Sequence, residues 1–138
     1  MAGSLTNAGE ELALNMLFRN TGTSPTGVYL GLATATINED DDLNTITEED
    51  DAGYSRIQVN FDAPVQDTGK AKIVNNAQIE FGPFSADADN PITHAFLCDA
   101  DTGTTGNILA HFELPTSKQP ATGESIIVLT GDCTIDLD

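Results

Sequence analysis

Over most of the chain, apolar residues alternate with polar ones, which is the pattern of strands that bury one face. In YSRIQVNF (54–61), Ile57, Val59 and Phe61 share one side, and Arg56 and Asn60 share the other. Turn-forming stretches rich in Gly, Asp, Asn and Pro separate nearly all such runs. Seven short strands are therefore predicted, in GVYLGLAT, YSRIQVNF, AKIVNNAQIEF, ITHAFLC, NILAHFEL, SIIVLT and CTIDLD. Without helices between them, these strands predict a mainly β fold, an antiparallel β-sandwich or jelly-roll-like domain.

The N-terminal segment has helical spacing instead. Its apolar residues lie three or four positions apart and form one face, namely Leu5, Ala8, Leu12, Ala13, Met16 and Leu17. Asn7 is the predicted N-cap, with Glu10 as its partner in a capping box. Asn20 and Gly22 are suitable residues to end the helix. One α-helix over residues 5–19 is predicted, placed across one end or edge of the sandwich.

Length and charge limit the class of protein. The 138 residues fit one domain, 1–138. Five basic residues face 22 acidic ones, for a net charge of −17, and such a surface repels nucleic acid and anionic membranes. No apolar run has the length of a membrane span, and no secretion signal is visible, so synthesis in a cytoplasm is expected.

Eight of the acids lie between Glu39 and Asp51, where two predicted strands are joined. A calcium loop of the helix–loop–helix type needs Gly at its sixth position and Glu at its twelfth. Counted from Asp40, these positions hold Thr45 and Asp51, so the pattern does not match. Residues 37–53 are interpreted as an acidic, solvated surface loop that its own charges extend and that a short turn could replace. A weak calcium site and a loop that meets a basic partner remain alternatives.

The remaining candidates for chemistry are weak. Asp99 and Asp101 lie in DADTGTTG, which is typical of a hairpin connection. His94 and His111 lack a metal-binding spacing. Cys98 and Cys133 lie in alternating runs and are expected to be buried free thiols, because a reactive thiol needs electropositive surroundings. No catalytic, metal-binding or cofactor-binding residue is predicted, and the chain is not expected to be an enzyme.

Several motifs occur in an order that carries a resemblance. They are LTNAGEELALNMLF, GVYLGLATA, GYSRIQVNF, NNAQIEFGPF, THAFL followed by DADTGTTGNIL, and a closing CTIDLD. From about Leu5 to Asp138, the chain resembles a family of small tailed-phage virion proteins, often labelled tail fibre or minor structural proteins, and is similar to capsid cement proteins. The long acidic insert and the scarcity of Trp and basic residues depart from the family. The resemblance implies a non-enzymatic structural role and supplies no catalytic residue.

From this resemblance we expect a capsid cement or decoration subunit on the capsid surface of the virion, made in the host cytoplasm. It would bridge major capsid proteins as a homo-oligomer, with a trimer favoured. The alternatives are a tail, neck or fibre-associated component, or an adhesin module that binds Ca²⁺ or carbohydrate through the acidic loop. The candidate interface is the apolar face of the helix, formed by Leu5, Leu12, Met16, Leu17 and Phe18.

Overall fold

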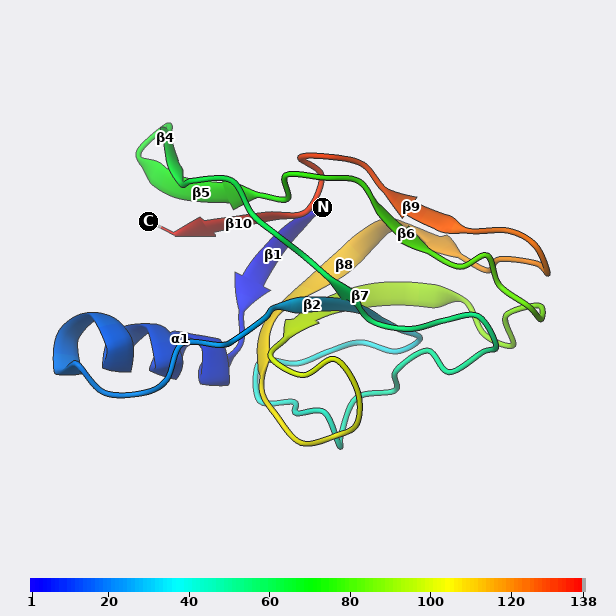
Figure 1. The fold of residues 1–138 in the computed structure, drawn as a ribbon, viewed down its shortest axis with the longest axis horizontal. Helices are drawn as coiled ribbons and strands as arrows, with labels where there is room; N and C mark the ends of the chain where they lie inside the picture. The colour runs from blue at the N-terminus through cyan, green and yellow to red at the C-terminus, as the bar shows by residue number, and fades with distance from the viewer. Residues whose placement is uncertain (138) are drawn as a thin grey trace.

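The computed structural model describes residues 1–137 of the chain. Within that range, ten strands and one helical arm follow one another along the chain (Figure 1). Their bounds are β1 (Ala2–Leu5), α1 (Asn7–Leu14), the π-helix η1 (Asn15–Arg19), β2 (Tyr29–Ala33), β3 (Ile57–Gln58), β4 (Val65–Asp67), β5 (Lys70–Val74), β6 (Ile79–Phe81), β7 (Ile92–Cys98), β8 (Ile108–Lys118), β9 (Ile126–Val128) and β10 (Thr134–Leu137).

Two sheets form the body of the protein. In the described range, eight strands form one sheet in the order β3-β2-β7-β8-β1-β10-β5-β4, and β6 pairs with β9 in a second sheet. The strands pair antiparallel, except for β1 with β10, which run parallel. The segment DADTGTTG joins β7 to β8 as a hairpin connection, as predicted. The prediction of a mainly β, antiparallel sandwich-like fold with one N-terminal helix is therefore confirmed.

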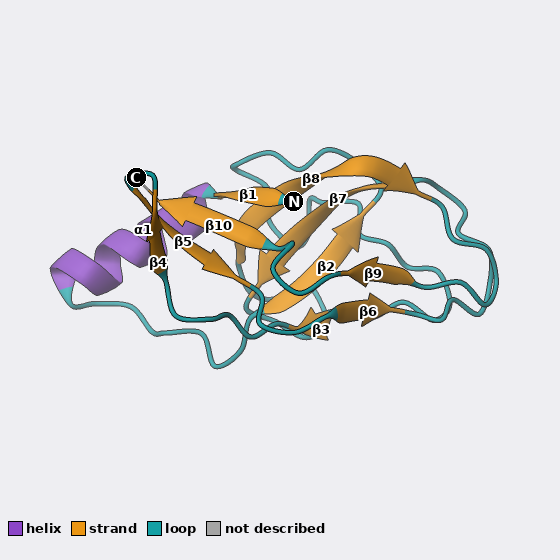
Figure 2. Ribbon diagram, turned by 90° about the horizontal axis from the view of Figure 1, so that it is seen from above, coloured by secondary structure: helices purple, strands orange, loops and turns teal. Residues whose placement is uncertain are grey.

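The small sheet covers one face of the large one and closes the main core. Phe81 of β6 and Val128 of β9 pack in one cluster with Leu30, Leu97 and Phe112 of the large sheet. Figure 2 shows β6 and β9 running together along one side of the larger sheet. Burying large side chains between two sheets is the main favourable term in such a fold, at about 25 cal/mol per Å² of apolar surface.

One predicted strand is divided by a buried polar residue. The run AKIVNNAQIEF forms β5 and β6, which belong to different sheets, and Asn75 follows the end of β5. Asn75 is fully buried, and its amide donates to the carbonyl oxygens of Ala77 (2.8 Å) and Leu129 (3.0 Å). Its Oδ1 accepts from the backbone N–H of Cys133 over 2.8 Å. These bonds satisfy the backbone where the chain passes from the large sheet to the small one.

The helix differs from its predicted bounds. Leu5 ends β1 by pairing with Ala110, so the helix begins at Asn7. The predicted N-cap, Asn7, is wrong, because the side chain of Thr6 caps the helix by accepting from the backbone N–H of Gly9 (3.1 Å). The last turn widens into the π-helix η1 and ends at Asn20, in the left-handed conformation (φ 51°). Among the described residues, no helix is long and apolar enough to cross a membrane.

Candidate functional site

The helical arm, residues 7–19, is fixed to the sheet at its first turn. Thr6 is fully buried; its backbone N–H donates to Leu109 O (3.1 Å), and its hydroxyl donates to Ile108 O. Gly9 is buried against β8, the strand that contains Ile108 and Leu109. A Cβ built on Gly9 would lie 2.1 Å from Leu109 O. A glycine is required here because the helix backbone lies so close to the backbone of β8.

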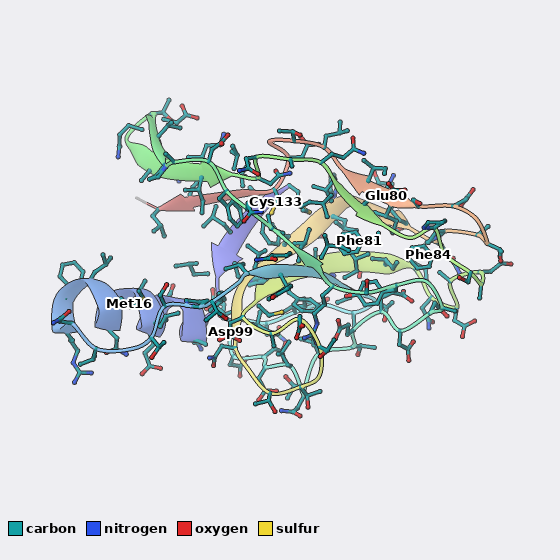
Figure 3. All side chains as sticks on the ribbon, viewed as in Figure 1. Met16, Glu80, Phe81, Phe84, Asp99 and Cys133 are labelled. Carbon is teal, nitrogen blue, oxygen red and sulfur yellow. The ribbon has the colours of Figure 1, made fainter. Side chains whose placement is uncertain are left out.

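The far end of the arm exposes large apolar side chains. Leu14 is 58% exposed, Leu17 73% and Phe18 79%. Figures 1 and 2 agree that the helix projects from the sheets, and Figure 3 places Met16 on this projecting part. A helical segment of 13 residues is marginal in water unless it packs against something. The exposed end of the arm is therefore a candidate surface for contact with another molecule.

The five predicted interface residues do not lie together. Met16, Leu17 and Phe18 are exposed on the arm. Leu5 instead ends β1 and packs against the main core. Leu12 is half-buried on the side of the helix that faces Gly22. That these residues form an interface stays a prediction, and within the arm it now rests on Met16, Leu17 and Phe18, together with Leu14.

The acidic segment, residues 37–53, covers the face of the large sheet opposite the small sheet. Ile37 and Leu43 are each 3% exposed and pack with Phe96, Cys98 and Ile108 in a second apolar cluster. Most acidic side chains between them point to solvent. The segment lies at the surface, but it is not an extended, replaceable loop. Shortening it to a turn would uncover the apolar face of β7 and β8.

An ionic network ties the acidic segment to the β7–β8 hairpin. The guanidinium of Arg56 binds both carboxylate oxygens of Glu48, at 2.8 and 2.6 Å, and also donates to the carbonyl oxygens of Ala100 and Gly103. Its Cζ lies 5.5 Å from the ring centroid of Phe96. The hydrogen bonds to Glu48 raise the pKa of Arg56. Burial raises the pKa of Tyr54, whose hydroxyl donates to Glu48 Oε1 over 2.8 Å.

Glu49, next to this network, has a different environment. Glu49 is 2% exposed, and its Oε1 accepts from the backbone N–H of Asp51 (2.8 Å). Burial, together with the neighbouring carboxylate of Asp51, raises the pKa of Glu49 to about 7. The side chains of Glu49, Asp50 and Asp51 each bring one oxygen to within 4.8 Å of the others. Among residues 1–137, these three are the acidic, His or Cys side chains that lie close enough together to share a metal ion.

The other residues considered for chemistry are separate. His94 and His111 line one recess with Ser4 and Glu113, but they do not converge as metal ligands within the described range. Cys98 and Cys133 are buried and free, as predicted. Burial raises the pKa of both thiols, that of Cys133 to about 12. Figure 3 shows Cys133 inside the body and Asp99 at the hairpin loop.

Taken together, these features define a small, mainly β protein with one projecting helical arm and a surface rich in carboxylates. A model of the family described as "Podophage GP4 fiber I protein gp80" matches residues 4–136, nearly the whole chain. The chain belongs to this family, and it is therefore a structural component of a tailed-phage virion. The predicted resemblance is confirmed. A comparison with curated protein sequences found no match.

Proposed function

We propose that the chain is a non-enzymatic, fibre-associated subunit of the virion that assembles with copies of itself through the helical arm. The observation that carries this proposal is the exposure of Leu17 and Phe18 at the end of the arm, at 73% and 79%. The description of the family as a fibre protein supports the fibre rather than the shell. A homotrimer is the favoured assembly.

An isolated arm leaves large apolar side chains in contact with water. Leu14, Leu17 and Phe18 would each gain about 1.5–3 kcal/mol if burial at a subunit contact became complete. A net charge of −17 keeps copies of the chain apart unless an apolar contact holds them together. Residues 14–20, at the exposed end of the arm, contain no acidic residue and one basic residue, Arg19, whose guanidinium donates to Asn15 Oδ1 (2.8 Å).

Light scattering after size exclusion tests the interface. We expect the wild-type chain to form an oligomer and Leu17→Ser/Phe18→Ser to be a folded monomer, because both side chains are exposed within one subunit. The control is Val65→Ser/Leu129→Ser, which removes two other exposed apolar side chains (59% and 56%) and should leave the oligomer intact. A monomeric wild type, or an oligomer that survives the arm substitutions, would contradict the proposal.

The place on the particle needs a second measurement. A capsid cement subunit that bridges major capsid proteins remains the rival, because an apolar arm could equally reach between shell subunits. We expect quantitative mass spectrometry of purified virions to give a few copies of this chain per hundred of the major capsid protein. A ratio near one, or near one-third, would contradict the fibre and support the cement subunit.

A further inference from the structure

Three neighbouring carboxylates meet where two segments of the chain touch. Asp51 Oδ2 accepts from the backbone N–H of Asp89 (2.9 Å), and Ala52 O accepts from that of Ser85 (2.6 Å). The acidic segment is therefore fastened at this point to the loop between β6 and β7. The oxygens of Glu49, Asp50 and Asp51 gather at the same junction, within 4.8 Å of one another.

One carboxylate oxygen of Glu49 lacks the hydrogen-bond partner that a buried polar atom requires. Glu49 is 98% buried, since its exposed fraction is 2%. Its Oε1 is bonded to the backbone of Asp51, but its Oε2 has no hydrogen-bond partner among residues 1–137. Leaving a buried carboxylate oxygen unpaired costs several times more than an ordinary hydrogen bond contributes, so native proteins rarely do so.

The nearby cation does not compensate this charge. Arg56 is bound through two nitrogens to Glu48, and its remaining bonds go to the carbonyl oxygens of Ala100 and Gly103. Glu48 is thus neutralised, whereas Glu49, Asp50 and Asp51 place up to three negative charges in one small volume. Such a group is stable when a positive ion shared by the three carboxylates offsets their repulsion.

We propose that Glu49, Asp50 and Asp51 bind a calcium ion at the junction of residues 49–52 with residues 85–89. Oxygen ligands suit hard divalent cations, and Ca²⁺ accepts irregular sets of carboxylates completed by water. Mg²⁺ demands near-ideal octahedral geometry, which three consecutive residues do not easily supply. The ion would fix the side chain of Asp51, whose Oδ2 accepts from the backbone N–H of Asp89 in the loop that follows β6. This site is independent of the fibre assignment.

The test is thermal unfolding of the full chain in EDTA and in CaCl₂. In about 10 mM Ca²⁺ we expect the melting temperature to rise by about 5 °C, as for a site with a dissociation constant on the order of 1 mM. Glu49→Gln and Asp51→Asn should each abolish the rise. The matched control is Asp40→Asn, which removes one charge from an exposed position of the same segment. This variant should keep the rise in melting temperature. Mg²⁺ at the same concentration should act more weakly.

Two other outcomes would overturn the site. An equal rise in the wild type and all three variants would mean that Ca²⁺ only screens the net negative charge. A melting temperature that rises on acidification but does not respond to Ca²⁺ would mean that the buried Glu49 is stabilised by a proton and not by a metal ion. Calorimetric titration of the wild type with Ca²⁺ provides a readout that does not depend on how the variants fold.

Discussion

Buried polar side chains set the positions where the chain changes direction. Thr6 closes β1 and caps α1, and Asn75 carries the chain from one sheet to the other. Each has backbone partners for its polar atoms, which is the condition for burying them without loss of stability. Asn75 Oδ1 also accepts from the backbone N–H of Cys133, whose side chain is fully buried.

The two thiols should therefore resist modification. With a pKa of about 12, Cys133 is ionised in only about one molecule in ten thousand at pH 8, and burial also raises the pKa of Cys98. We expect iodoacetamide at about pH 8 to leave the native chain unlabelled for hours, while the denatured chain takes up two labels within minutes. Intact mass spectrometry measures this directly. Fast labelling of native Cys133 would show that the core around Asn75 opens.

Residue-level properties of this kind are the least accessible to sequence reasoning. The sequence shows eight similar acids between Glu39 and Asp51. Only the fold distinguishes Glu49, which is buried, from Asp40, which is exposed. The sequence offers only a weak sign that Glu49 is buried. Glu49 lies close to the predicted start of the YSRIQVNF strand, where a side chain can turn inward. Matching residues 40–51 to the helix–loop–helix calcium pattern could not identify Glu49, because that pattern describes a different kind of site.

At the scale of elements, the acidic segment acts as a cover for the large sheet. Ile37 and Leu43 lie among its acids as two apolar anchors that contact the face of β7 and β8. Arg56 then binds Glu48 of the segment to the hairpin that joins those strands. Packing and the ion pair together keep a strongly charged segment close to the sheet, in spite of the repulsion between its carboxylates.

Removal of one anchor should be costly. Leu43 is 3% exposed, and we expect Leu43→Ala to lower the free energy of unfolding by about 2–4 kcal/mol, because it leaves a cavity over Phe96 and Ile108. Glu39→Ala, an exposed change in the same segment, is the control and should have little effect. Urea denaturation followed by circular dichroism gives both values. Equal stability of the two variants would mean that the segment is a dispensable loop after all.

Element-level prediction succeeded for several alternating runs and failed at irregularities. The regular alternation of YSRIQVNF gave the buried side correctly, with Ile57, Val59 and Phe61 in the main core, but only Ile57–Gln58 form a strand, β3. The runs that gave β2, β7, β8 and β10 were all found from their period of two. Bulges at Ile92/His94 and at Leu97/Cys98 shift the register, so Ile92 faces away from His94, and Ile108 away from Ala110. A bulge reverses the faces beyond it, and alternation alone cannot locate one. β1 and β4 were missed because they are short and partly polar, without a clear alternation.

At the scale of the whole molecule, charge is the dominant property. A net charge of −17 on 138 residues makes every folded copy repel itself and its neighbours. The main core and the second cluster under the acidic segment hold the fold against this repulsion. Salt shortens the range of the repulsion, with a screening length of about 10 Å at 0.1 M and about 3 Å at 1 M.

We therefore expect the melting temperature to rise steadily with NaCl at neutral pH, because screening relieves the self-repulsion of the folded state. Near the sequence pI of about 4.1, where the net charge vanishes, the same range of NaCl concentrations should change the melting temperature little. Differential scanning calorimetry at both pH values makes the comparison. A salt effect of the same size at the two pH values would indicate that charge does not limit the stability of this protein.

The outer strands of the large sheet have a consequence for assembly. Within residues 1–137, the sheet ends in β3, of two residues, and β4, of three, whose Asp67 is paired with Lys72 across the hairpin. Edges this short and this charged offer a neighbouring strand little backbone to pair with. Copies that associate through their arms would thus gain little from pairing of sheet edges, and the arm contact alone would set the symmetry of the assembly. Strand pairing between copies would then not be the means by which this protein builds a longer structure.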